Sequence, residues 1–266
     1  MFLLTALLAA ALGLMAAGHV VARRRPRFGK VLVPALAALL VGKAVLDSRP
    51  DWEWRLFPWR DYAFVQGFVV YTLAAAFFGA ASAALPTKWN RVVVLLVGLG
   101  VLGHGAVRHR WLAWPEVHGD ARVADRNLHV QQSTMYTCGP AACCTALAHL
   151  GIVVDERTMA AACLTRSDGT RLFDLYRGLV VTTAGHAIAV SIEDPSADEI
   201  LAERLVVVGT NEGRGHALCY VGRGDYVVRH DPLRRHADEW DPANLRTHYR
   251  GPAVVLRPLG PAAAPR

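Results

Sequence analysis

The sequence predicts a chain in two parts of different fold class, N-terminal all-α transmembrane helices followed by an α+β domain. Of the 266 residues 53% are hydrophobic and 19% are charged. The apolar residues concentrate before about residue 110, in runs long enough to cross a bilayer. A helical segment after Cys138 and a hairpin pattern further on indicate that the second part combines helices with antiparallel strands.

Four transmembrane helices are predicted within a membrane domain of residues 1–110, over residues 2–22, 31–46, 62–85 and 92–107. The second is the shortest, at 16 residues, and it contains Pro34 and Lys43. An arginine-rich stretch follows the first segment, and no small-residue cleavage site precedes it in the order that a signal peptide requires. The first segment is therefore predicted to be a signal anchor.

The residues between these segments predict a multi-pass protein of the cell membrane. Six of the seven tryptophans flank the segments, as expected of an aromatic belt at the membrane interfaces: Trp52, Trp54, Trp59, Trp89, Trp111 and Trp114. Lysine and arginine are equally frequent on the two sides, but the dense cluster at residues 23–27 favours a cytoplasmic first connection. Four spans then place the α+β domain outside the cytoplasm, whereas loss of the second span would place it inside.

After a predicted linker, residues 111–126, the next element is a helix that begins at Cys138. Good helix formers follow Cys138, Pro140 occupies the first turn, and Gly151 is a C-terminal stop. A cysteine at a helix N-terminus has a lowered pKa, which favours the nucleophilic thiolate. Gln132, six residues upstream, supplies a side-chain amide that can donate to an oxyanion. The other four cysteines are interpreted as small buried hydrophobic residues.

A predicted β-hairpin supplies partners for Cys138. Residues 216–221 are typical of a strand, 222–225 of a turn and 226–230 of a returning strand. A tight turn centred between residues 223 and 224 would place His216 directly opposite Asp231, with Cβ atoms about 5 Å apart. There a carboxylate fixes the tautomer of an imidazole, whose other nitrogen takes the thiol proton. His230 is predicted to point to the other face of the sheet.

These residues resemble the C39 peptidases, papain-like cysteine proteases that cleave double-glycine leaders in bacteriocin and peptide exporters. The resemblance covers residues 127–258 and is carried by Gln132, Cys138-Gly139-Pro140-Ala141-Ala142, Leu150-Gly151, Gly215-His216 and His230-Asp231-Pro232. It implies a papain-like peptidase domain with Cys138 as nucleophile, His216 as general base and acid, Asp231 as the residue that orients His216, and Gln132 as oxyanion donor. It implies no metal or organic cofactor.

Two features differ from the exporters of that family. Their peptidase precedes the membrane domain and an ATPase follows it, whereas here the peptidase-like part comes last and no Gly-x-x-x-x-Gly-Lys-Ser/Thr motif occurs. The chain is therefore expected not to be an ATP-driven exporter itself, and a separate ABC exporter is a candidate partner. Tyr136-Thr137 stands where an acidic residue often precedes the cysteine of the family.

We therefore expect a membrane-anchored cysteine peptidase, with the leader peptides of secreted peptides as candidate substrates. Two alternatives stay open: a non-hydrolytic leader-peptide-binding module of a transport system, and an envelope amidase or transpeptidase. The expected partners are a peptide or protein substrate and the lipid bilayer. No nucleic acid is expected, because the residues behind the net charge of +7 largely frame the spans and face lipid headgroups. The tail, residues 259–266, is predicted to be disordered.

Overall fold

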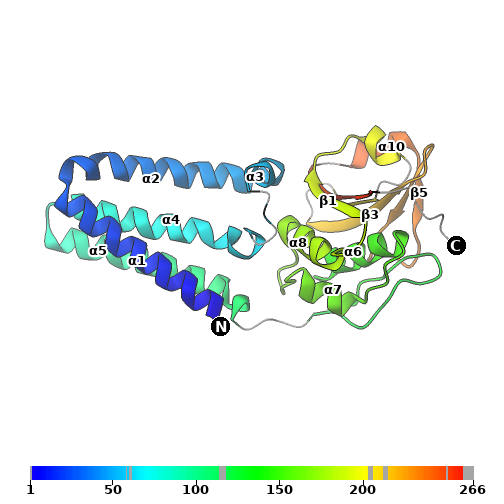
Figure 1. Cartoon of the computed structure of the whole chain (residues 1–266), viewed down its shortest axis with the longest axis horizontal. Helices are drawn as coiled ribbons and strands as arrows, with labels where there is room; N and C mark the ends of the chain where they lie inside the picture. The colour runs from blue at the N-terminus through cyan, green and yellow to red at the C-terminus, as the bar shows by residue number, and fades with distance from the viewer. Residues whose placement is uncertain are drawn as a thin grey trace. The chain divides into compact units, whose positions relative to one another are not determined.

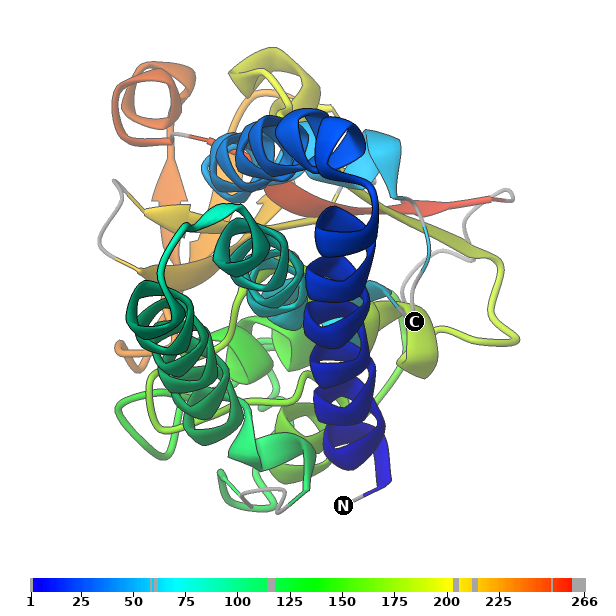
Figure 2. The same ribbon diagram turned by 90° about the vertical axis from the view of Figure 1, so that its left-hand side faces the viewer.

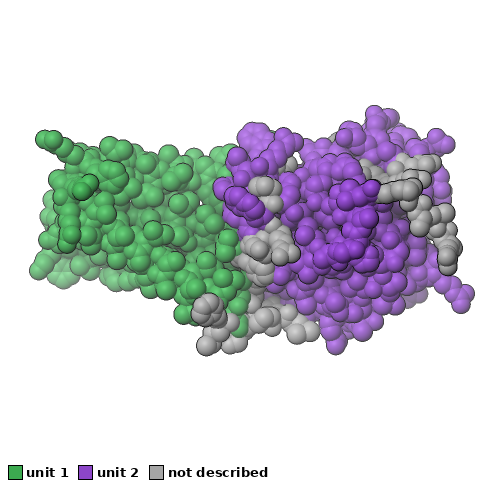
Figure 3. All heavy atoms as spheres, in the orientation of Figure 1, with its two compact units in different colours: residues 1–49, 64–115 green, residues 50–63, 116–266 purple. Residues whose placement is uncertain are grey.

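The computed structural model describes residues 2–57, 59, 62–113, 118–202, 206–211, 215–249 and 251–259. Two compact units make up the chain, unit 1 with residues 1–49 and 64–115, and unit 2 with residues 50–63 and 116–266 (Figure 3). Part of the predicted linker, residues 114–117, and part of the predicted tail, residues 260–266, lie outside the described residues.

Unit 1 is built from four long helices, each long and apolar enough to cross a membrane: α1 (Phe2–Arg24), α2 (Pro26–Asp47), α4 (Tyr62–Ala84) and α5 (Lys88–Arg108). A short 3-10 helix, η1 (Arg110–Leu112), follows. The second helix is longer than the predicted 31–46, because Pro26 occupies its first turn, where a helix tolerates proline. Its 22 residues correspond to about 33 Å, enough to span the hydrocarbon core.

The helices of unit 1 pack closely around α1 (Figures 1 and 2). A Cβ added to Gly79 on α4 would lie 2.0 Å from the carbonyl oxygen of Met15 on α1, so only glycine permits this approach. The polar groups near the end of α2 are paired. Lys43 is buried and contacts Asp47, whose carboxylate also accepts a hydrogen bond of 2.9 Å from Gln66 on α4. A lysine inside an apolar segment is thereby compensated.

Unit 2 contains a six-stranded antiparallel sheet with strand order β1-β6-β2-β3-β4-β5 (Figure 1). Its strands are β1 (Ile188–Glu193), β2 (Val206–Asn211), β3 (His216–Gly222), β4 (Val227–His230), β5 (Asp238–Trp240) and β6 (Ala253–Pro258). Side chains of β3 alternate between two apolar clusters, because successive residues of a strand point to opposite faces. Ala217 and Cys219 join one cluster, and Leu218 and Tyr220 join the other.

Helices cover both faces of this sheet. The face of Ala217 and Cys219 packs against α6 (Cys138–His149), α7 (Glu156–Ala162) and α8 (Leu172–Thr182). The opposite face packs against α9 (Ala197–Leu201) and α10 (Pro242–His248). Helix α6 is buried along almost its whole length, which explains why its residues are small or apolar all round.

A further helix, α3 (Pro50–Leu56), lies in the connection between α2 and α4 and belongs to unit 2. From the sequence alone, this connection is predicted to belong to the membrane domain, with Trp54 in the interfacial belt. Instead, the Trp54 ring lies 4.2 Å from the ring of Tyr176 on α8, and the Tyr62 hydroxyl donates to Glu53 at 2.7 Å. Trp54 contributes to the core of unit 2, because burial against another aromatic ring is more favourable than an exposed position.

Candidate active site

Three elements bring the candidate catalytic side chains together. Cys138 is the first residue of α6, His216 is the first residue of β3, and Asp231 directly follows β4. Because β3 and β4 are antiparallel neighbours, the start of β3 and the end of β4 lie at the same end of the sheet. Helix α6 packs on β3, so its N-terminus adjoins this end.

His216 and Asp231 form a close hydrogen-bonded pair. The Nε2 atom of His216 donates to Oδ1 of Asp231 at 2.7 Å, and both side chains are mostly buried. The same carboxylate oxygen accepts the backbone N–H of Leu233 at 3.0 Å. With its proton on Nε2, a neutral His216 carries a lone pair on Nδ1, the nitrogen left to take a proton from a thiol.

The register of the hairpin differs from the prediction by two residues. Cys219 pairs with His230 and Gly222 with Val227, so His216 does not face Asp231 directly. The connection is longer than a tight turn because it docks on α9, where the N–H of Gly224 donates to the carbonyl of Leu201 at 2.8 Å. A shift of two residues keeps each side chain on its original face of the sheet. The hydrogen bond is therefore made diagonally rather than directly across the ladder.

The pKa values of Cys138 and His216 are displaced in opposite directions. Burial raises the pKa of the Cys138 thiol, but hydrogen bonds from the His216 side chain and from the amides of Ala217 and Gly139 lower it by more. The net result is a pKa below the ordinary value of a thiol. The hydrogen bond to Asp231, followed by that to Cys138, raises the pKa of His216 to about 9. Both displacements favour a thiolate beside an imidazolium, the ionised pair of an activated cysteine nucleophile.

Cys138 is set apart from the other cysteines by this environment. All five are free thiols. Burial raises the pKa of Cys143, Cys144 and Cys219 above its ordinary value, so these thiols stay protonated. Inert thiols of this kind behave as small hydrophobic residues.

The fourth candidate, Gln132, lies in the loop that leads to α6. Its Nε2 donates to the carbonyl of Thr134 at 2.6 Å, and its Oε1 is buried without a hydrogen-bond partner among the described residues. The backbone N–H of Gln132 donates to the carbonyl of Pro232 at 3.0 Å, which ties this loop to the turn after Asp231. One N–H of the carboxamide is thus committed to the backbone.

The buried carboxylate of Glu156, which no sequence pattern indicates as part of the site, accepts hydrogen bonds from the backbone of the same loop. Glu156, the first residue of α7, is fully buried and accepts the N–H of Ser133 at 2.8 Å and that of Asp120 at 3.3 Å. A glutamate in the first turn of a helix usually faces solvent and the helix dipole. Only the chain fold, which returns residues 120–133 across α7, makes Glu156 an internal acceptor.

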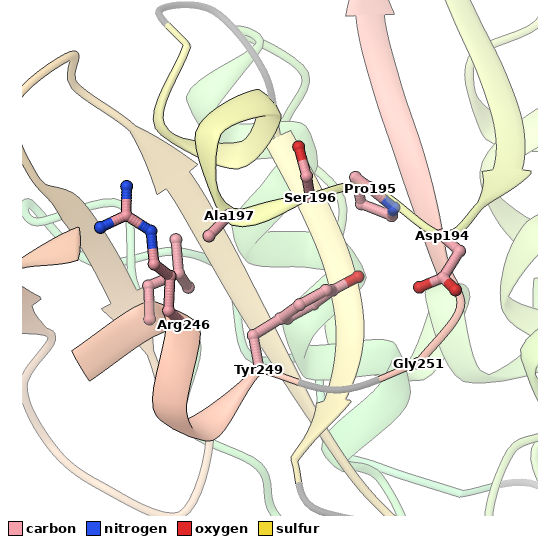
Figure 4. Close-up of a pocket in the computed structure, with 8 residues that line it drawn as sticks. Asp194, Pro195, Ser196, Ala197, Arg246, Tyr249 and Gly251 are labelled. Atoms are coloured by element: carbon pink, nitrogen blue, oxygen red, sulfur yellow. The ribbon is translucent and has the colours of Figure 1, made fainter. Parts of the chain in front are cut away.

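Other potential sites are separate from these residues. No cluster of His, Cys, Asp or Glu with the geometry to hold a metal ion occurs in the described part of the chain. A cavity of about 360 Å³ is lined by Asp194, Pro195, Ser196, Ala197, Leu245, Arg246, Tyr249 and Gly251 (Figure 4). Leu245 and Tyr249 belong to the apolar cluster on the α10 face of the sheet, and none of the four candidate catalytic residues lines the cavity.

Comparison with known proteins gives a weak likeness to solved structures. No protein-family model matches the chain, and no curated protein matches it. Among solved structures, the chain is similar to the peptidase domain of Streptococcus ComA, a bifunctional ABC transporter involved in a quorum-sensing pathway. The match has 15% sequence identity and a TM-score of 0.41, and it covers 49% of this chain and 97% of that domain.

Proposed function

We propose that this chain is a membrane-anchored cysteine peptidase in which Cys138 attacks the carbonyl carbon of a peptide bond. The observation that carries the proposal is the continuous contact from Cys138 through His216 to Asp231 at one end of the sheet. A nucleophile, a base and a carboxylate that orients the base form the arrangement required for thiol-based acyl transfer.

The proposed reaction has two halves. The Cys138 thiolate adds to the carbonyl carbon, and the oxyanion accepts hydrogen bonds from the Cys138 backbone N–H and the Gln132 side chain. The C–N bond then breaks, and the His216 imidazolium gives its proton to the leaving amine. In the second half His216 takes a proton from water, the hydroxide attacks the thioester, and the Cys138 thiolate is released with the new carboxylate.

The substrate class follows from the motif rather than from the geometry of the triad. The spacing of Gln132 and Cys138-Gly139-Pro140 supports a C39-like, papain-like peptidase that processes the leaders of secreted peptides. A separate ABC exporter is the partner that such a role requires. A non-hydrolytic binding module would need no activated thiol, so the lowered pKa of Cys138 favours the enzyme over that alternative.

The proposed location of unit 2 is outside the cytoplasm. Helix α3 and residues 118–259 belong to one unit, so α4 and α5, which connect them, cross the membrane as a pair. Helix α2, at 22 residues, is long enough to span as well. With the arginine cluster at residues 23–27 on the cytoplasmic side, the single crossing of α2 places α3, and with it unit 2, on the opposite side.

Hydrolysis of a peptide library by the full chain in detergent micelles tests the proposal. The wild type and the Cys219→Ala variant are expected to cleave, because Cys219 is buried away from the triad. Cys138→Ala is expected to abolish cleavage. Activity that survives in Cys138→Ala would overturn the assignment, and so would an inactive wild type that binds the same peptides as tightly as Cys138→Ala does.

A further inference from the structure

Three histidines outside the proposed triad form a continuous chain of contacts inside unit 2. Nε2 of His149 lies 3.0 Å from Nε2 of His230, and Nδ1 of His230 lies 3.3 Å from Nδ1 of His129. The chain ends at the carbonyl of Arg234, 2.9 Å from Nε2 of His129. His129 and His230 are 3% and 1% exposed, so solvent does not compete for these nitrogens.

The Arg234 carbonyl determines the tautomers of all three imidazoles in this row of contacts. A carbonyl only accepts, so Nε2 of His129 carries the proton and its Nδ1 accepts. Nδ1 of His230 must then donate, which leaves its Nε2 as an acceptor. Nε2 of His149 donates to that acceptor. A proton added to His129 or His230 would remove an acceptor and break the chain, so both rings are required to be neutral.

The surroundings of the three imidazoles favour this neutral state. Burial lowers the pKa of His230 to about 3, with smaller contributions in the same direction from the neighbouring His149, His129 and Arg223 side chains and a smaller opposite one from Asp125. Burial and Arg223 lower the pKa of His149 to about 4.

Each histidine belongs to a segment that carries a different candidate catalytic residue. His129 lies three residues before Gln132, His149 is the last residue of the helix that Cys138 begins, and His230 directly precedes Asp231. The three imidazoles therefore link the segments that carry Gln132, Cys138 and Asp231.

The contact with Arg234 acts on the turn that carries Asp231. Residues 231–234 form a turn in which the N–H of Arg234 donates to the carbonyl of Asp231 at 2.9 Å. His129 holds the end of this turn through the Arg234 carbonyl, and the N–H of Gln132 holds its middle through Pro232. Movement of the turn would displace the carboxylate from His216.

We propose that His129, His230 and His149 are positioning residues, which hold the Asp231 turn so that its carboxylate meets His216. The catalytic consequence rests on the proposed function, whereas the effect on the His216–Asp231 pair does not. A displacement of about 1 Å at a catalytic group lowers rates by on the order of a hundredfold, so loss of the anchor is expected to matter for catalysis.

Two substitutions at residue 129 separate the hydrogen bonds from the volume of the side chain. His129→Gln retains an N–H for the Arg234 carbonyl and an oxygen that accepts from His230, whereas His129→Leu retains neither. The primary measurement is the pH dependence of Cys138 alkylation by iodoacetamide in the full chain, resolved by peptide mass analysis, because it needs no substrate. His216 titration by NMR and peptide hydrolysis complete the set.

His129→Leu is expected to move the His216 titration from about pH 9 toward lower pH and to slow alkylation of Cys138 at neutral pH. It is also expected to lower kcat/KM by roughly tenfold to a hundredfold. His129→Gln is expected to restore the wild-type profiles. His149→Leu removes the imidazole at the other end of this row of contacts. It replaces His129→Leu as the test variant if His129→Leu does not fold.

The outcomes distinguish this proposal from the proposed function. A folded leucine variant that lowers the unfolding temperature but leaves the His216 titration and the alkylation profile unchanged would show that the histidines only pack, and would overturn the proposal. If the wild type cleaves peptides in that case, the peptidase assignment stands. If no peptide is cleaved but the profiles shift in His129→Leu and recover in His129→Gln, the positioning role stands and the peptidase assignment fails.

Discussion

The hydrogen bond to the Asp231 carboxylate is the largest influence on the pKa of His216. That pKa is about 9 in the folded chain against an ordinary value of 6.5. His216 therefore binds its proton more tightly when the chain is folded. The resulting stabilisation is fully present below about pH 6.5, and it is lost as the pH rises through about 9.

We expect kcat/KM for peptide cleavage to fall on the alkaline side with a midpoint near pH 9, where His216 loses its proton. Asp231→Asn removes the negative charge, so the midpoint should move toward the ordinary value of histidine. Asp225→Asn, in the exposed turn, is the matched control and should leave the profile unchanged. A midpoint that stays near pH 9 in Asp231→Asn would contradict the role given to this carboxylate.

Gln132→Ala is expected to lower kcat by roughly 10² to 10³, the usual cost of losing one oxyanion donor. Alkylation of Cys138 should change little, because Gln132 is not among the groups that lower its pKa. The neighbouring exposed Gln131→Ala is the control. Steady-state kinetics on one peptide substrate separate the two variants, and a loss confined to Gln131→Ala would move the oxyanion role to that residue.

At the scale of elements, the sequence predicts helices and strands that follow from local residue patterns. It does not predict features that depend on contacts between elements distant in the sequence. The helix at Cys138 and both strands of the hairpin follow from periodicity and turn residues. The hairpin register does not, because the contact of Gly224 with Leu201 on α9 joins elements that the local sequence cannot relate. Strand periodicity nevertheless preserved the pairing of His216 with Asp231, since an even shift keeps both on one face.

The supports of the site could not be predicted for the same reason. Glu156 and His129 carry no local signature that distinguishes them from surface residues. Their roles arise because distant segments return past them, and burial then makes every polar contact count. Similarly, Trp54 matched an interfacial pattern by composition, and only its contact with Tyr176 assigns it to unit 2.

Helix α7 supplies a prediction about stability. Glu156→Ala removes the acceptor of the Ser133 N–H, and an N–H group left unsatisfied in this way costs about 1–3 kcal/mol, whereas the N–H of Asp120 keeps the Ser133 hydroxyl as an acceptor at 3.0 Å. Glu156→Gln retains one acceptor oxygen, so its effect should be smaller. Thermal unfolding of the full chain measures both, with exposed Glu239→Ala as the control. Equal stability of Glu156→Ala and Glu239→Ala would show that water replaces the carboxylate.

At the scale of the whole molecule, the division of unit 2 between two stretches of sequence predicts a membrane topology. Single cysteines introduced at exposed positions, Arg55→Cys in α3 and Arg235→Cys after β4, should react with a membrane-impermeant maleimide from the same side. Arg27→Cys, in the first turn of α2, should react only from the opposite side. The four buried cysteines and Cys138 are replaced by alanine to provide the background. Labelling of Arg27→Cys and Arg55→Cys from one side would show that α2 does not cross.

The contact between Trp54 and Tyr176 also orders events during synthesis. Helix α3 leaves the ribosome before α4 and α5, whereas β3 with His216 and the turn with Asp231 are made after them. Helices α4 and α5 are synthesised between these two parts of unit 2. Unit 2 is therefore completed only after the hydrophobic segments have been synthesised, and until then Cys138, His216 and Asp231 are not assembled.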